Sequence, residues 1–371
     1  MIHLFEPWHI GGKLTLENRI IIPPMCQYSA ENGKMTDWHR IHMGSMLTSG
    51  AGMFIIEATA VSPEGRITPY CVGLWSDETA QAMDRVLSSV RQYSAMPIAI
   101  QLGHAGRKAS TPKPWESEQT GQHVIQPDEP LGWQTIAPSA IPFYSDSTPP
   151  RAMTSTDIEQ LVEDFVTAAK RAEALGIDGI ELHMAHGYLL HEFLSPLSNQ
   201  RTDEYGGNLD NRMRLPLQVF KAVKAAVSAD LPIWVRISAT DWIEGGWDLE
   251  QSICLCRELK QLGCPVIHVS TGGLALAQQI PAGPGYQVYF ASEIRAKVGI
   301  PTIAVGLINE AEQAENILAS HQADAIAIGR GLLHNPHWPW LAAEKLNRQI
   351  STAPQYWRGT TNPNQKHLFK Q

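Results

Sequence analysis

The sequence predicts a single-domain α/β protein, a (β/α)8 TIM barrel with its active site at the C-terminal face. Three observations predict this fold. Eight short apolar runs alternate with helical patterns, and no linker of low complexity divides the chain. The length of 371 residues also falls within the range of one such barrel. The predicted barrel covers residues 1–358, and residues 359–371 form a polar C-terminal tail.

The predicted strands are apolar along their whole length, which is typical of parallel strands that are buried on both faces. They lie at residues 19–25, 52–60, 97–104, 177–182, 232–237, 265–270, 301–306 and 324–329. The intervening helices are predicted at 36–49, 78–94, 154–175, 208–229, 249–262, 286–298 and 310–319. The longest helix begins at Thr154-Ser-Thr-Asp, where capping residues precede an amphipathic run.

A doubly wound open sheet is the alternative arrangement of alternating strands and helices. It is disfavoured because no G-x-G-x-x-G sequence opens the first helix, and because the strand count stops at eight. The segment 105–152 is rich in Pro, Ser, Thr and Trp and has no clear period. A connection of this length is expected to be a functional loop or cap, or to contain small elements of its own.

Composition narrows the function classes. The formal charge is −8 and no block of Lys or Arg occurs, which argues against nucleic acid or an anionic membrane as partner. No stretch approaches the roughly 18 apolar residues of a membrane span, and the N-terminus does not resemble a signal peptide. The five cysteines are scattered, without the spacing of a metal or disulfide framework, so a reducing cytoplasm is the predicted location.

The last two predicted strands end in sequences that suit a phosphate group. Strand seven ends at Gly306, and strand eight ends in Ile328-Gly329-Arg330-Gly331. In TIM barrels the loops after these two strands often bind phosphate, because glycine lets backbone N–H groups approach closely. Arg330 would add a charge-assisted contact. Either loop alone could be a tight turn, but the two together favour a phosphate-bearing ligand.

Two imidazoles and a phenol follow the predicted strand at 177–182. His183, His186 and Tyr188 occupy one loop at the strand's carboxyl end, where chemistry is concentrated in parallel α/β proteins. The histidines could be structural, or they could be zinc ligands, although no H-E-x-x-H pattern supplies the further ligand. No G-x-S-x-G sequence is present for a serine nucleophile. A redox role would require an organic cofactor, because no side chain here donates hydride.

Several longer segments resemble the Old Yellow Enzyme family of FMN-dependent ene reductases. They extend over most of residues 4–358, and the subgroup they resemble most is the thermophilic-like one, which includes xenobiotic reductases. The segments are Pro24-Met-Cys-Gln-Tyr28, residues 57–68, Gln101-Leu-Gly-His-Ala-Gly-Arg-Lys108, residues 137–141, His183-Met-Ala-His-Gly-Tyr-Leu189, and residues 193–207.

The resemblance implies FMN at the C-terminal face and a set of residues that hold it. Gln101 is implied to bind the pyrimidine edge of the isoalloxazine, and Arg236 to lie near its N1 and O2 atoms. The residues implied to flank the isoalloxazine are Pro23, Pro24, Met25, Cys26 and Ala58. Those implied to hold the phosphate are Gly306, Gly329 and Arg330. Many members of the subgroup have a hydroxyl residue where Pro23 stands. Residues 112–133 also form a longer segment than in the shortest relatives.

The resemblance further implies ping-pong reduction of the C=C bond of α,β-unsaturated carbonyls and related activated alkenes, with NADPH or NADH as hydride donor. His183 and His186 would bind the carbonyl oxygen, and Tyr188 would donate the proton to the α-carbon. The remaining implied site residues are Cys26, which modulates the flavin, and Tyr28, Lys108 and Arg358, which contact substrate. Arg358 would reach the neighbouring active site in a homodimer or homotetramer. The competing interpretation is a flavin-binding sensor or storage barrel with incidental reductase activity.

Overall fold

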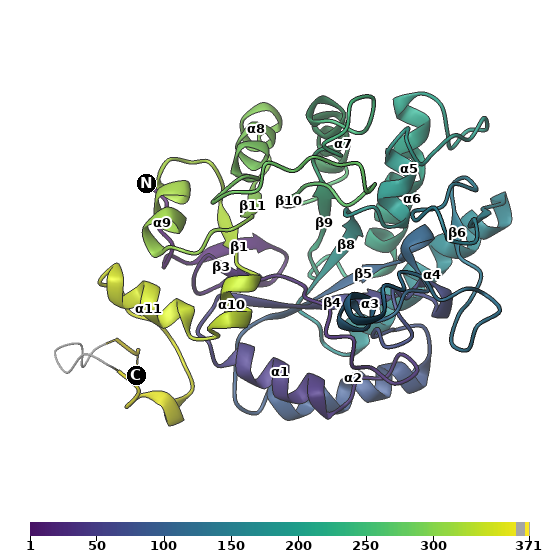
Figure 1. Cartoon of the computed structure of the whole chain (residues 1–371). Helices are drawn as coiled ribbons and strands as arrows, with labels where there is room; N and C mark the ends of the chain where they lie inside the picture. The colour runs from purple at the N-terminus through teal and green to yellow at the C-terminus, as the bar shows by residue number, and fades with distance from the viewer. Residues whose placement is uncertain (361–367, 371) are drawn as a thin grey trace.

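The computed structural model describes residues 1–360 and 368–370. Eight parallel strands close into a barrel in the order β10-β11-β12-β3-β4-β5-β8-β9, which confirms the predicted (β/α)8 fold. Helices surround these strands (Figure 1). The strands are β3 (Ile20–Ile22), β4 (Met53–Ala60), β5 (Ile98–Gly103), β8 (Gly179–Met184), β9 (Ile233–Ser238), β10 (Ile267–Ser270), β11 (Thr302–Val305) and β12 (Ala325–Ala327).

The helices between the strands also lie where the sequence predicts them. They are α1 (Asp37–Leu47), α2 (Asp77–Val90), α4 (Ser155–Ala174), α6 (Leu209–Ala226), α7 (Leu249–Gln261), α8 (Val288–Val298) and α9 (Ala311–Ala319). The N-cap of α4 is Thr154, whose side chain accepts a hydrogen bond from the backbone N–H of Asp157. This capping satisfies a donor that would otherwise lack an intrahelical partner.

The first barrel strand is shorter than predicted. The apolar run 19–25 forms a strand only over Ile20–Ile22. Pro23 and Pro24 have no backbone N–H to donate to a neighbouring strand, so the ladder ends before them. The chain therefore leaves the sheet at Pro23, at the carboxyl end of β3.

Several short elements were not predicted individually. An antiparallel hairpin of β1 (Trp8–Gly11) and β2 (Leu14–Leu16) precedes the barrel. The segment 105–152 contains α3 (Pro114–Thr120), β6 (Ile136–Ala137) and β7 (Arg151–Ala152), so it does include small elements of its own. The others are α5 (Leu189–Leu194), α10 (Arg330–His334) and α11 (Trp338–Lys345).

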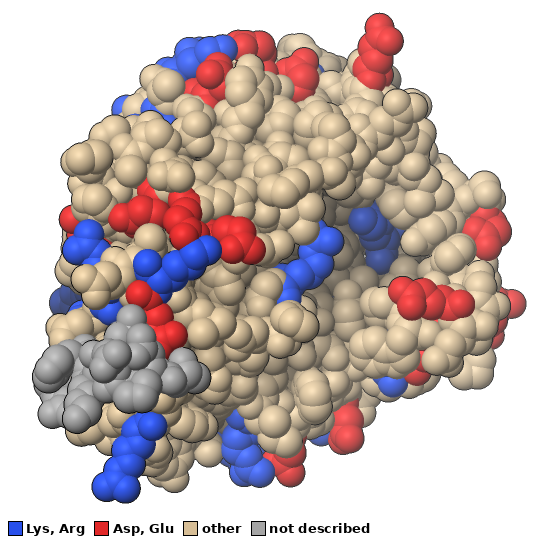
Figure 2. Space-filling view, turned by 60° about the vertical axis from the view of Figure 1, so that its left-hand side comes forward, with Lys and Arg blue, Asp and Glu red and all other residues tan. Residues whose placement is uncertain are grey.

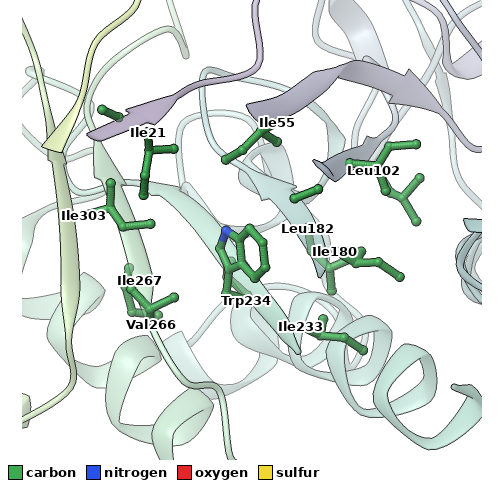
Figure 3. Close-up of a cluster of buried hydrophobic side chains, with 14 of the residues drawn as sticks. Ile21, Ile55, Leu102, Ile180, Leu182, Ile233, Trp234, Val266, Ile267 and Ile303 are labelled. Atoms are coloured by element: carbon green, nitrogen blue, oxygen red, sulfur yellow. The ribbon is translucent and has the colours of Figure 1, made fainter. Parts of the chain in front are cut away.

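Aliphatic side chains and Trp234 fill part of the barrel interior. Figure 3 shows Trp234 of β9 with side chains from other strands around it, such as Ile21, Ile55 and Ile303. Trp234 is completely buried, and a Cβ on Gly179 of the neighbouring strand would lie 2.4 Å from its ring. Gly179 therefore makes the room that the indole occupies.

The predicted polar tail lies only partly within the described residues, because residues 361–367 and 371 fall outside them. Near its end, Leu368 and Phe369 are buried and pack with Trp340 and Ile350. Phe369 also forms a parallel bridge with Ile350. The end of the chain is therefore anchored on the body of the protein by apolar contacts.

Candidate active site

The loops after β11 and β12 border one cavity of about 180 Å³. Arg236, Gly306, Gly329 and Arg330 all line it, so the structure brings four of the predicted cofactor residues together. A Cβ on Gly329 would lie 3.6 Å from the sulfur of Met25 and 3.7 Å from Pro23, which places the segment after β3 beside the same loop. Figure 2 shows a hollow in the molecular surface with Lys or Arg side chains in and beside it.

Arg236 supplies the buried positive charge of this cavity. Its side chain is 8% exposed, and among the described residues its Nε atom has no hydrogen-bond partner. Burial lowers the pKa of the guanidinium, although an arginine remains charged at neutral pH. A buried cation with an unpaired donor needs an acceptor to offset its desolvation. The cavity is therefore suited to an anionic or strongly polar ligand.

His183, His186 and Tyr188 form a compact cluster at the carboxyl end of β8. The ring centroids of His183 and His186 are 5.2 Å apart, and those of His183 and Tyr188 are 5.0 Å apart. His186 has a φ of +60°, and the following Gly187 has a φ of +71°. This left-handed turn directs both imidazoles and the phenol toward a common region.

The hydrogen bonds of the two imidazoles bear on which ring nitrogen carries the proton. Burial lowers the pKa of His183 to about 3 and the pKa of His186 well below its ordinary value, so both rings are neutral at pH 7. Nδ1 of His183 accepts the N–H of Ala185 at 3.3 Å, which leaves Nε2 as the donor. Nε2 of His186 lies 2.7 Å from the hydroxyl of Ser270.

Ser270 belongs to a further chain of hydrogen bonds. Its hydroxyl lies 3.3 Å from Oε1 of Gln287, whereas Thr271 donates to the same oxygen at 2.6 Å. The amide of Gln287 donates in turn to the carbonyl of Val305 at the end of β11. The 3.3 Å contact with Gln287 is long for an O–H···O bond, so the single hydroxyl proton of Ser270 is assigned to the 2.7 Å contact with His186, which leaves the Nδ1–H of His186 for a ligand.

Buried polar side chains, His191 and Asp241 among them, hold the loop that carries the cluster. The backbone N–H of Gly187 donates to Nδ1 of His191 at 2.9 Å, and Nε2 of His191 lies 2.9 Å from a carboxylate oxygen of Asp241. The other carboxylate oxygen of Asp241 accepts from Ser195 and from the backbone of Trp247. Sequence reasoning missed this buried support, because Asp241 and Ser195 are 46 residues apart in the chain.

Lys108 lies at the cluster but is engaged by the protein itself. Its ammonium donates to the carbonyls of His186 and Gly273 at 2.9 and 2.8 Å, and it lies 5.1 Å from the ring centroid of Tyr188. Burial lowers its pKa to about 8. The substrate contact of Lys108 stays a prediction, whereas its structural role is visible, because Lys108 ties the His186 turn to the loop after β10.

The segment after β3 brings Cys26 and Tyr28 to the same face. The N–H of Gln27 donates to the carboxylate of Glu57 at 3.0 Å, which holds the segment against β4. Burial raises the pKa values of the Cys26 thiol and the Tyr28 phenol, so both stay protonated at neutral pH. The ring of Tyr28 meets Trp115 of α3 edge to face at 5.9 Å, so the 112–133 segment borders the site.

Of two other predicted residues, Ala58 lies at this cluster and Arg358 lies away from it. Ala58 lines a small cavity together with His183 and Tyr188. Arg358 is exposed and follows the last short helical turn, η3 (Pro354–Tyr356), on a segment separate from the cluster. Within the described residues, no group of three or more His, Cys, Asp or Glu could hold a metal ion. In that same part of the chain no helix could cross a membrane.

Comparison with known proteins agrees with this geometry. The model of the NADH:flavin oxidoreductase / NADH oxidase family matches residues 3–349. An NADPH dehydrogenase of Listeria innocua is 46% identical over 360 residues, which cover 96% of this chain and 99% of that protein. An NADPH dehydrogenase of Geobacillus thermodenitrificans is 42% identical over 358 residues, which cover 96% and 98%.

Solved structures show the same architecture. Morphinone reductase has a TM-score of 0.74 and 28% identity, with 100% of this chain and 94% of that chain covered. A 2-naphthoyl-CoA reductase complex has a TM-score of 0.81 at 23% identity, and the match covers 95% of this chain but only 53% of that longer chain. The latter similarity concerns the fold alone.

The closed parallel barrel, with a cavity bordered by the loops after its seventh and eighth strands, defines a TIM-barrel protein with a site suited to a phosphate-bearing ligand. The chain belongs to the NADH:flavin oxidoreductase / NADH oxidase family, that is, to the Old Yellow Enzyme family. Its cofactor is FMN, and its reductant is a nicotinamide dinucleotide, NADPH or NADH. The buried guanidinium of Arg236, whose Nε has no partner among the described residues, and the glycine-bordered cavity fit a cofactor that carries a phosphate and becomes anionic when reduced.

Proposed function

We propose that the protein reduces the C=C bond of α,β-unsaturated carbonyl compounds and related activated alkenes. The observation that carries this proposal is the cluster of His183, His186 and Tyr188, whose rings lie about 5 Å apart beside the cofactor cavity. Two neutral imidazoles that each present an N–H can hold one carbonyl oxygen. A phenol on the same loop can then reach the neighbouring carbon.

Each residue of the cluster has a role in this reaction. Bound FMN, reduced by NADPH, supplies the hydride that is added to the β-carbon. His183 and His186 bind the carbonyl oxygen and stabilise the negative charge that develops there. Tyr188 donates its phenolic proton to the α-carbon, so hydride and proton together saturate the double bond. Burial raises the pKa of the Tyr188 phenol, and the positive charge of Arg236 offsets part of that effect, which helps the phenolate that remains until solvent restores the proton.

The cofactor is held by the residues that converge on the cavity and the adjoining face. Arg236 would lie near the part of the flavin that becomes anionic on reduction, and Gln101 would bind its pyrimidine edge. The residues proposed to flank the ring system and to hold the phosphate are Pro23, Pro24, Met25, Cys26 and Ala58, and Gly306, Gly329 and Arg330. Tyr28 adds a phenol at the substrate side, next to Trp115 of α3.

The test of this function is stopped-flow kinetics of the two half-reactions. Tyr188→Phe should slow reoxidation by cyclohexenone about 100-fold or more, the usual contribution of a general acid, and leave reduction by NADPH nearly unchanged. Tyr93→Phe, at an exposed position in the turn that follows α2, is the control. A flavin that is reduced once by NADPH but not reoxidised by enones would contradict the proposal and favour a sensor or storage role.

Assembly into a homodimer or homotetramer is part of the proposal. Arg358 is exposed on the segment that follows α11, so it is available to a second copy of the chain. In this arrangement its guanidinium contacts substrate in the neighbouring site. Arg358→Ala should raise the KM for the alkene with unchanged FMN content. This assembly would be contradicted if the wild-type protein sedimented as a monomer and Arg358→Ala kept the wild-type KM.

A further inference from the structure

A buried carboxylate lies directly beneath the catalytic cluster. Glu181 is completely buried on β8, two residues before His183, so both side chains point to the same side of the strand. Its Oε1 accepts from the amide nitrogen of Gln101 at 2.7 Å. Its Oε2 accepts from the indole of Trp234 at 2.8 Å and lies 2.7 Å from Nδ1 of His268.

The strand register explains why these residues meet. Glu181 is aligned with Gln101 of β5 on one side and with Trp234 of β9 on the other. His268 of β10 is aligned with Arg236 of β9, one layer closer to the C-terminal face. Three separate strands therefore direct hydrogen-bond donors at one carboxylate inside the barrel, and Trp234 lies at the centre of that interior (Figure 3).

Charge balance requires Glu181 to be ionised. Burial alone would raise its pKa, but His268, Arg236 and the indole of Trp234 together hold the pKa down at about 2. Burial and the nearby Arg236 lower the pKa of His268, so this ring is neutral and donates its Nδ1–H to Glu181. The formal charges of this interior group are then one negative, at Glu181, and one positive, at Arg236. Burying either without the other would be strongly unfavourable.

We infer that Glu181 is a positioning residue that sets both the orientation of Gln101 and the reduction potential of the bound flavin. This inference rests on the proposed contacts of Gln101 and Arg236 with FMN. Glu181 lies below the histidine pair and does not itself touch the substrate.

The orientation follows from hydrogen-bond chemistry. A carboxylate can only accept, so Glu181 binds the NH2 group of Gln101 and leaves the amide oxygen of Gln101 for the cofactor. A flavin presents the N3–H donor at its pyrimidine edge, which that oxygen can accept. Without Glu181 the amide could rotate by 180° and present a donor to a donor, which would cost binding free energy.

The effect of Glu181 on the reduction potential of the flavin follows from electrostatics. Arg236 favours the reduced, anionic flavin, whereas the negative charge of Glu181 opposes part of that effect from inside the same barrel. Removing the charge should stabilise the reduced form relative to the oxidised form. At an effective interior dielectric constant of about 20 the expected shift is about tenfold in the redox equilibrium, equal to about 30 mV for a two-electron couple.

The first experiment measures the reduction potential and the FMN dissociation constant of purified holoenzyme without any alkene. Glu181→Gln should raise the potential by about 30 mV and weaken FMN binding about tenfold. Glu181→Asp keeps the charge on a shorter side chain, so it should retain the wild-type potential and lose only affinity. Glu192→Gln is the matched control, because burial raises the pKa of that buried carboxyl to about 8 and it carries little charge at pH 7.

A second variant tests the inference without altering Glu181. Trp234→Phe removes one donor from the carboxylate and leaves its charge less neutralised, so the potential should fall by a few tens of mV at most, opposite in sign to Glu181→Gln. Trp247→Phe is its control, because this indole is equally buried but its N–H has no partner among the described residues. The second pair remains informative if Glu181→Gln does not fold.

The outcomes separate this inference from the proposed function. Unchanged potentials in both Glu181→Gln and Trp234→Phe would overturn it, as would equal shifts in the two tryptophan variants. Potentials that shift as expected in a protein that does not reduce enones would support the role of Glu181 and contradict the proposed alkene reduction. Normal enone turnover with unshifted potentials would support the alkene reduction and overturn the role of Glu181.

Discussion

Ser270→Ala should weaken ligand binding at the histidine pair although Ser270 is not proposed to contact the substrate. The hydroxyl of Ser270 lies 2.7 Å from Nε2 of His186. If the Ser270 hydroxyl donates to His186, as its long 3.3 Å contact with Gln287 favours, then His186 carries its proton on Nδ1 and can donate to a ligand oxygen. Losing that bond removes the preference for this tautomer.

The magnitude follows from one neutral hydrogen bond. Such a bond contributes about 1 kcal/mol, so the dissociation constant of a phenolic ligand should rise roughly fivefold. Charge-transfer titration of the oxidised holoenzyme with a para-substituted phenol measures this constant directly. Ser252→Ala is the control, since this equally buried serine on α7 donates to the carbonyl of Ala239.

Three results would decide the role of Ser270. An increase in the dissociation constant that is confined to Ser270→Ala supports the His186 tautomer with its proton on Nδ1. An unchanged dissociation constant would refute any influence of Ser270 on His186. Tighter binding would show that Ser270 accepts from His186 in the wild type, so that its removal frees the ring to donate from Nδ1. FMN content is measured in parallel, because Ser270 also borders the cofactor cavity.

Three further predictions concern the same face. His183→Ala should weaken binding of phenolic ligands at least tenfold, whereas unchanged charge-transfer titrations would refute its role in binding the ligand oxygen. Lys108→Met should lower the free energy of unfolding by about 2 kcal/mol, because two charge-assisted bonds are lost, with exposed Lys170→Met as the control in urea titrations. Glu192 has a folded-state pKa of about 8 against 4.5 unfolded, so the folded state binds more protons and stability falls as pH rises from about 4.5 to 8. Glu192→Gln should make unfolding midpoints less dependent on pH across that window, and an unaltered slope would contradict the assignment.

The alternation of apolar strands and helices was sufficient to predict the barrel. Parallel strands buried on both faces leave a strong local pattern, and so do capped amphipathic helices such as α4. The glycines after β11 and β12 could be interpreted as a phosphate site from the sequence for the same reason. That interpretation needs only the local backbone requirement for glycine and the position of each loop in the strand order. The end of β3 was predicted too late, since the two prolines after Ile22 were counted as part of an apolar run.

The sequence by itself therefore determined the fold, the family resemblance, and the polar residues at the strand ends. Only the tertiary structure placed Glu181 beside Gln101 and Trp234, and Ser270 beside His186. These contacts join residues that are 53 to 84 positions apart in the chain. Which side chains meet inside a barrel depends on the register between strands, and a one-residue shift would turn each side chain to the opposite face. Local patterns carry no record of that register.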